Sequence, residues 1–217
     1  MKLKYFNPVF LMLSAGLFLL GFGSCKKNVI NNLTTDETRI YISNYDTTAN
    51  FASYKTFSID DSADVIENGQ VLGRIAGPFE DSVINNVVQL MKQRGYTFVN
   101  KADSPDLAMN ISEVTNTETE LFSYSDYWDA YGSYYDPYYW GYPGFGYYPT
   151  SYFVGGYTIQ EGGLELDLLD LKNAVSLGNK IQIIWTGLSR GEGVFSDKSA
   201  PGAVAALFSQ SPYIKTN

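Results

Sequence analysis

The sequence predicts an α+β fold, with an antiparallel β-sheet and two helices packed on one face. Short runs of alternating apolar and polar residues indicate strands, and two segments carry apolar residues at helical spacing. These segments follow the order strands, helix, strands, helix, which is typical of this class. A chain of 217 residues with 45% hydrophobic residues is long enough for one ordinary domain with a proper core.

The first predicted strands lie before the longer helix. Residues 39–45 alternate between apolar and polar side chains, and residues 54–59 form a second candidate strand. Residues 65–72 hold Asn68-Gly69 between apolar residues, a pattern typical of a two-residue hairpin turn.

The clearest predicted helix spans residues 78–94. Pro78 suits the first turn, and Gly95 is well suited to the C-terminal cap. Apolar residues at positions i, i+3, i+4 and i+7 predict one buried stripe, made by Ile84, Val87, Val88 and Met91.

The remaining elements follow this helix. Residues 96–99 suggest a short strand, and the alternation in residues 107–112 indicates a half-buried one. Two alternating runs, at residues 164–168 and 181–185, predict an antiparallel pair. A short helix between Pro201 and Pro212 completes the expected order.

The N-terminus has the layout of a secretory signal. Lys2 and Lys4 precede a largely apolar stretch over residues 6–22, which small residues and Cys25 follow. The apolar stretch is short for a membrane-spanning helix, which needs about 20 residues. We expect a signal peptide over residues 1–24, a lipidated tether over residues 25–38 and the domain over residues 39–217. An uncleaved N-terminal membrane helix is the alternative.

The segment Phe22-Gly23-Ser24-Cys25 resembles the lipobox of bacterial lipoproteins, although most lipoboxes carry Leu at the position of Phe22. The resemblance implies a diacylglycerol on the Cys25 thiol and cleavage before that residue. Because two or more acyl chains hold a protein stably on a membrane, covalent lipid such as palmitate would suffice as an anchor. Lys26 differs from the Asp that marks inner-membrane retention, and residues 26–35 contain no acid. We therefore expect an outer-membrane lipoprotein facing the periplasm.

Charge and composition limit the classes of function that we expect for this chain. The net charge is −8, so the surface repels phosphate backbones and nucleic acid is not an expected partner. The chain has no histidine, which removes the commonest general base and zinc ligand. We expect no catalytic residue, no metal and no cofactor. The obvious acids, Asp126, Asp129 and Asp136, lack the spacing of a calcium loop.

The most distinctive stretch is an aromatic insert over residues 116–157. It holds twelve of the 18 tyrosines, and no Lys or Arg occurs between Lys101 and Lys172. One interpretation is a contact surface, because Tyr and Trp give rigid amphipathic area. Its candidate residues are Tyr127, Trp128, Tyr131, Tyr134, Tyr138 and Trp140. The other interpretation, which we favour for its shape, is a low-complexity loop lying on the domain. If the insert is a contact surface and not part of the core, we expect its removal to leave the domain folded.

Several segments in order resemble the bacterial lipoprotein family called domain of unknown function 4136, of the Bacteroidetes type. They are Phe51 with Tyr54-Lys55-Thr56-Phe57, Gly95-Tyr96, Pro105-Asp106-Leu107, Ile184-Trp185-Thr186-Gly187 and Ala203-Val204. The resemblance covers about residues 39–214, with the insert as an outlier. It implies no activity and carries no functional residue, because the family has none established.

Two functions follow from these patterns. The first is a non-catalytic envelope lipoprotein that binds a protein partner or scaffolds an assembly. The alternative is a glycan-binding module that uses the aromatic insert. In both cases the membrane is reached through covalent lipid.

Overall fold

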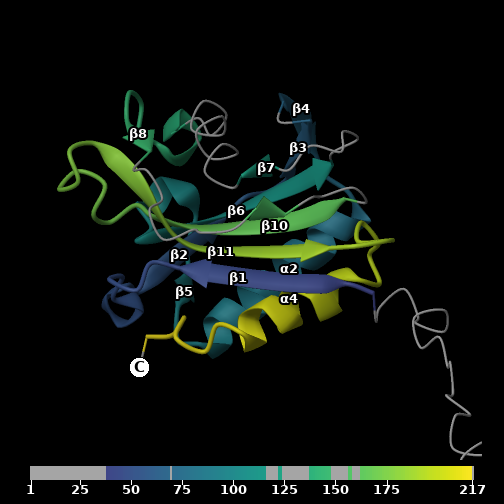
Figure 1. Ribbon diagram of the computed structural model, residues 1–217. Coiled ribbons are helices and arrows are strands. Elements are labelled where there is room, and N and C mark those ends of the chain that lie inside the picture. The colour runs from purple at the N-terminus through teal and green to yellow at the C-terminus, as the bar shows by residue number, and fades with distance from the viewer. Residues whose placement is uncertain are drawn as a thin grey trace, which may run out of the picture. The chain divides into compact units, whose positions relative to one another are not determined.

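The computed structural model describes residues 38–68, 70–115, 122–123, 137–147, 156–157 and 162–216 (Figure 1). The predicted signal peptide, the tether up to residue 37 and Cys25 therefore lie outside the described residues. Within the described part, no helix has the length and apolarity needed to cross a membrane.

The domain is built on a nine-stranded sheet whose main path runs β1-β11-β10-β6-β2-β5, with β3, β4 and β8 attached beside it. Strands from the two ends of the chain are neighbours in this path (Figure 1). The strands are β1 (Ile40–Tyr45), β2 (Thr56–Ile59), β3 (Ala63–Glu67), β4 (Gln70–Ile75), β5 (Thr97–Phe98), β6 (Leu107–Thr115), β8 (Gly146–Tyr147), β10 (Gly163–Asp170) and β11 (Lys180–Arg190).

The long pairings are antiparallel, as predicted. β10 pairs with both β6 and β11, and β1 pairs with β11 along its whole length. β3 and β4 form the predicted hairpin, where Asn68 has the positive φ of 49° that such a tight turn requires.

The prediction of an antiparallel sheet nevertheless needs one correction, because the sheet is mixed. β6 runs parallel to β2 and β3, β5 runs parallel to β2, and β8 runs parallel to β11. The helix between β4 and β5 carries the chain back along the sheet, so β5 and β6, which follow it, run in the same direction as β2.

The longer helix, α2 (Pro78–Gln93), confirms the predicted element, and it confirms two residues of the predicted stripe, Val87 and Met91. Its buried apolar residues are Phe79, Val83, Val87 and Met91, at intervals of four. Ile84 and Val88 are only partly buried at the edge of the core. The predicted stripe and the observed row both follow the spacing of a helix, so periodicity alone does not decide which of them is buried.

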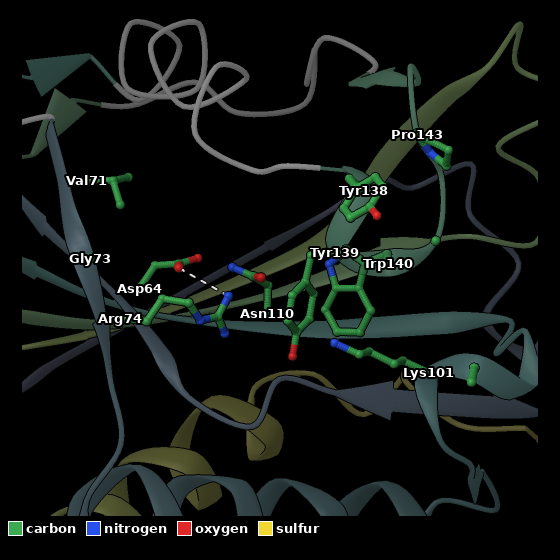
Figure 2. A pocket seen from close by; sticks show the side chains of 12 residues that line it. Asp64, Val71, Gly73, Arg74, Lys101, Asn110, Tyr138, Tyr139, Trp140 and Pro143 are labelled. Atoms are coloured by element: carbon green, nitrogen blue, oxygen red, sulfur yellow. Dashed lines mark ion pairs between the residues drawn. The ribbon is translucent and has the colours of Figure 1, made fainter.

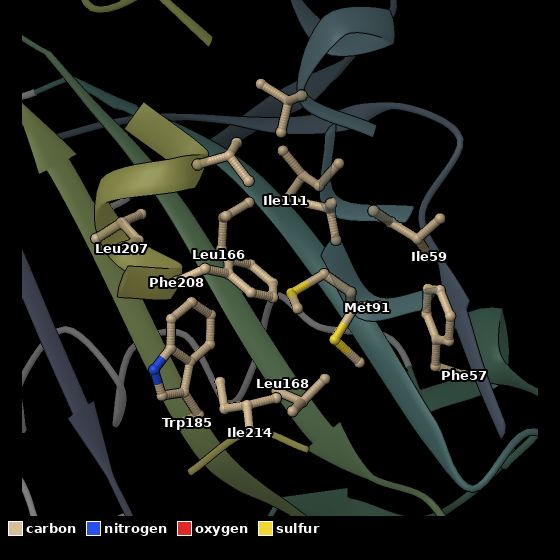
Figure 3. Packing of buried hydrophobic residues seen from close by; sticks show 14 of the residues in the cluster. Phe57, Ile59, Met91, Ile111, Leu166, Leu168, Trp185, Leu207, Phe208 and Ile214 are labelled. Atoms are coloured by element: carbon tan, nitrogen blue, oxygen red, sulfur yellow. The ribbon is translucent and has the colours of Figure 1, made fainter. Parts of the chain in front are cut away.

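The main core lies between the helices and one face of the sheet. Both α2 and the second helix, α4 (Ala200–Ser209), contribute side chains to the same cluster. Phe208 of α4 packs against Trp185 of β11 with 5.8 Å between the ring centroids (Figure 3). Val204, Leu207 and Phe208 are buried in this core.

A smaller core cluster lies on the other face and includes Ala108, Leu169, Ile183 and Trp140. Because both faces of the central strands are covered, β10 is buried at all eight positions and β6 at seven of nine. The prediction of a half-buried strand at residues 107–112 is therefore wrong. Burial extends even to Glu165 and Asp167, whose alternation with leucines indicates a solvent-facing side.

Part of the aromatic insert covers the sheet face that lies away from the helices. Residues 137–147 contain the 3₁₀ helix η4 (Pro137–Trp140) and β8, which pairs with the start of β11. Near the ends of the insert, β7 (Phe122–Ser123) pairs antiparallel with β9 (Gly156–Tyr157). The expectation of a removable surface loop does not hold for residues 137–147, because Trp140 is buried in the second cluster.

Candidate functional site

A pocket of about 790 Å³ lies beside η4 (Figure 2). It sits on the face of the sheet away from the helices. Asn110 lines the pocket, whereas its neighbours Met109 and Ile111 point into the helix-side core, as alternation along a strand requires. The lining comes from β3, β4, β6, the 3₁₀ helix η3 (Lys101–Asp103) and residues 138–143.

Three consecutive aromatic residues form one wall of the pocket. Tyr138 is 69% exposed, whereas Trp140 is only 3% exposed. The ring of Tyr139 meets that of Trp140 edge to face, with 4.9 Å between their centroids. Trp140 thus anchors the wall in the core while Tyr138 stays accessible to a ligand.

The opposite side of the pocket is organised by Arg74 of β4. Its guanidinium forms ion pairs with Asp60 at 2.6 Å and Asp64 at 3.4 Å. The Nε atom of Arg74 also donates a hydrogen bond to the Ser62 hydroxyl at 2.8 Å. The cation lies 4.6 Å from the centre of the Tyr139 ring, so it joins the β3–β4 hairpin to the aromatic wall.

Burial disturbs the carboxyl groups of this network. Because Asp60 is fully buried, desolvation raises its pKa to about 7, although Arg74 opposes the rise. Burial also raises the pKa of Asp64, and Arg74 partly opposes that change. For Asp61, the raising effect of burial is outweighed by hydrogen bonds from Ser62 and Tyr139, which hold its pKa below the usual value. At this one site, the pKa values of Asp60 and Asp64 are therefore raised, whereas that of Asp61 is lowered.

Two hydrogen-bond donors of the pocket are not used by the network. Lys101 makes no ion pair with a described residue, and its Nζ lies 3.5 Å from the centre of the Tyr139 ring. Asn110 is 1% exposed and faces Asp64, yet its Nδ2 makes no hydrogen bond of acceptable geometry within the described part of the chain. A buried amide without an acceptor is costly, which makes it a natural contact for a ligand.

The residues predicted as a contact surface fall into two groups. Tyr138 and Trp140 both line the pocket, but Trp140 is a core residue and not the free surface expected of it. Tyr127, Trp128, Tyr131 and Tyr134 lie outside the described residues, as do Asp126, Asp129 and Asp136. Among the described residues there is no group of three or more Cys, Asp or Glu side chains suited to holding a metal ion.

Sequence reasoning missed the polar half of the pocket. Lys101 could have been noticed in the sequence, because it is the last cation before the long stretch without Lys or Arg. For Arg74 and Asn110, only their places on alternating strands distinguish them in the sequence. Their roles depend on Asp60 and Tyr139, which other segments supply.

The fold and the pocket define this chain as an α+β domain with a ligand-sized cavity on the sheet face away from its helices. It belongs to the family described as a domain of unknown function (DUF4136), whose model matches residues 42–213.

A solved structure from the same family is similar to this chain, and a second solved structure matches more weakly. A DUF4136 family protein from Bacteroides thetaiotaomicron is similar, with 25% identity and a TM-score of 0.64, over 82% of this chain and 98% of that chain. A PelC dodecamer from Paraburkholderia phytofirmans matches at 10% identity and a TM-score of 0.38, over 82% of this chain and 99% of that chain. Among curated proteins, no sequence matches the chain.

Proposed function

We propose that this chain is a lipid-anchored cell-envelope protein that binds a glycan in the pocket beside η4, without catalysing a reaction on it. The observation that carries the proposal is the combination of an exposed aromatic ring, Tyr138, with an unsatisfied buried amide, Asn110, in one cavity. Sugar rings offer apolar faces to aromatic side chains and many oxygens to polar donors, so this combination suits them.

The pocket's charged groups support a binding role. Arg74 pairs with Asp60 and Asp64, so these groups hold the hairpin against the aromatic wall. The chain also lacks histidine, and Cys25 is assigned to the lipid anchor. The proposed location is the outer membrane, on its periplasmic side, where peptidoglycan and polysaccharides are glycans within reach.

Calorimetric titration tests the proposal. The full chain in detergent is titrated with neutral and acidic oligosaccharides, and we expect saturable binding of at least one of them. Tyr138→Leu should weaken that binding about tenfold, because it removes an exposed ring without opening the core. Phe98→Leu, at another exposed aromatic residue outside the pocket, serves as the matched control. If neither class of oligosaccharide binds, the glycan proposal fails.

A protein-binding or scaffold function is the second candidate. Leu72 and Ile75 on β4 favour it, because these large apolar side chains are 61% and 43% exposed on a strand that pairs only with β3 among the described strands. Crosslinking of intact envelopes followed by pull-down tests this candidate. Recovery of a partner by the wild type, and its loss in Leu72→Asp, would favour the scaffold over the glycan.

A further inference from the structure

Three charged residues line the pocket: Asp64, Arg74 and Lys101. The guanidinium of Arg74 is matched by Asp64 and by the fully buried Asp60 behind it. Lys101 is therefore the one lining charge without an ion-pair partner in the described residues.

The geometry around Lys101 holds its ammonium at the pocket. Its Nζ sits 3.5 Å from the centre of the Tyr139 ring, and Figure 2 shows it below the rings of Tyr139 and Trp140. Such a contact restrains a long side chain without neutralising its charge. Asp61 interacts with Lys101 through its charge, but these two described side chains form no ion pair. The Lys101 ammonium is therefore available to bind an anionic ligand.

Asn110 adds a second donor. Figure 2 shows it between Arg74 and Tyr139, on the other side of the Tyr139 ring from Lys101. Its Nδ2 is buried and lacks an acceptor in the described part of the chain. A ligand that satisfies both groups must bring acceptor oxygens, one of them charged, together with an apolar face for Tyr138.

We propose that the pocket selects glycans that carry a carboxylate, such as uronic-acid-type sugars, and that Lys101 is the residue that determines this specificity. The inference rests on the proposed glycan-binding function and names the chemical class of its ligand. A carboxylate provides the charged acceptor for Lys101, ring oxygens or hydroxyls serve Asn110, and the sugar face stacks on Tyr138. A neutral sugar would leave the Lys101 charge unmatched.

Paired ligands test the inference. The full chain in detergent is titrated with galacturonate oligomers and with galactose oligomers of the same length. We expect tighter binding of the acidic oligomer, with a preference that shrinks as salt is added, because screening weakens charge contacts at the surface. Lys101→Gln should weaken acidic binding about tenfold and leave neutral binding unchanged. Lys198→Gln makes the same charge change at an exposed site outside the pocket and should alter neither.

The outcomes separate the two proposals. If both oligomers bind equally and Lys101→Gln changes neither affinity, the carboxylate preference is refuted while glycan binding stands. If neither oligomer binds to the folded wild-type chain, the glycan-binding function itself is refuted. Thermal melting of both lysine variants establishes that they are folded, so a loss of affinity is not a loss of structure.

Discussion

At the scale of single residues, the fold keeps two carboxyl groups close together. Glu80, in the first turn of α2, is 3% exposed and interacts with Glu113 of β6. Burial, a hydrogen bond with Glu80 and the charge of Glu80 raise the pKa of Glu113 to about 8. Two acids at one place cannot both ionise without repulsion, so one of them keeps its proton.

This pair predicts that stability falls as pH rises. The folded chain holds a proton on Glu113 that the unfolded chain releases near the ordinary pKa of 4.5. The pair therefore carries no penalty below about pH 4.5, and the penalty is complete above about pH 8. Glu113→Gln should raise the melting temperature relative to wild type at pH 8.5 and have little effect at pH 4.5. Glu192→Gln, at an exposed acid, is the control, and identical pH slopes for Glu113→Gln and wild type would contradict the assignment.

The pairing of Arg74 with Asp60 gives a second prediction. Arg74→Ala leaves a fully buried carboxyl without its cation and should cost about 2 kcal/mol of unfolding free energy at pH 8. The pKa of Asp60 is already raised to about 7, so the carboxyl is largely protonated at pH 5 and the cost there should be smaller. Urea unfolding at both pH values measures this. A loss that is equal at the two values would show that Arg74 acts through packing and not through charge.

At the scale of elements, α2 shows how one helix can present two apolar stripes. Val83 is fully buried, while the adjacent Ile84 is only partly buried. In the fold, α2 is oriented about its axis so that one row of side chains faces the sheet. This row consists of Phe79, Val83, Val87 and Met91.

Charge substitution distinguishes the two stripes. Val83→Asp should destabilise the domain by about 3 to 5 kcal/mol, because it buries an unpaired charge. Ile84→Asp should cost roughly 1 kcal/mol, since its carboxylate can reach water. Gln89→Asp on the exposed face provides the baseline. Chemical denaturation of all three variants checks the order, and a larger loss for Ile84→Asp than for Val83→Asp would reverse the orientation given to the helix.

The aromatic wall makes a similar prediction for η4. Trp140→Ala should cost about 3 to 5 kcal/mol, because it empties a large buried volume in the second core cluster. Tyr138→Ala, two residues away at a 69% exposed position, should change stability by about 0.5 kcal/mol or less. Comparable melting temperatures for the two variants would mean that η4 does not belong to the core.

At the scale of the whole molecule, the proposed lipid anchor is the feature that remains to be tested. The described residues begin at residue 38, and the predicted lipidation site, Cys25, precedes them by a polar segment.

The anchor is tested in cells. Labelled palmitate should enter the wild-type chain but not Cys25→Ala, because the thiol that accepts the lipid is absent from the variant. Ser24→Ala leaves the acceptor thiol in place and is the control for a neighbouring change. Equal labelling of wild type and Cys25→Ala would exclude lipidation at this residue.

The sequence by itself determined the kind and order of most elements. The strand at residues 40–45, the hairpin at Asn68, the helix from Pro78 and the antiparallel pair after residue 163 all follow from local period and turn chemistry. These signals lie within a few residues of one another, so one sequence is enough to detect them. The family resemblance was detectable for the same reason, because it consists of short motifs in a fixed order. The family model matches residues 42–213.

Only the tertiary structure decided which face each side chain meets. Strand alternation indicated solvent for Glu165 and Asp167, but a second layer of the chain covers that face. The parallel pairing of β2 with β6 and the pocket itself bring together residues far apart in the sequence, such as Arg74 and Tyr139. No local pattern encodes these contacts. They depend on how the elements pack, and packing free energy is gained only once distant segments share one core.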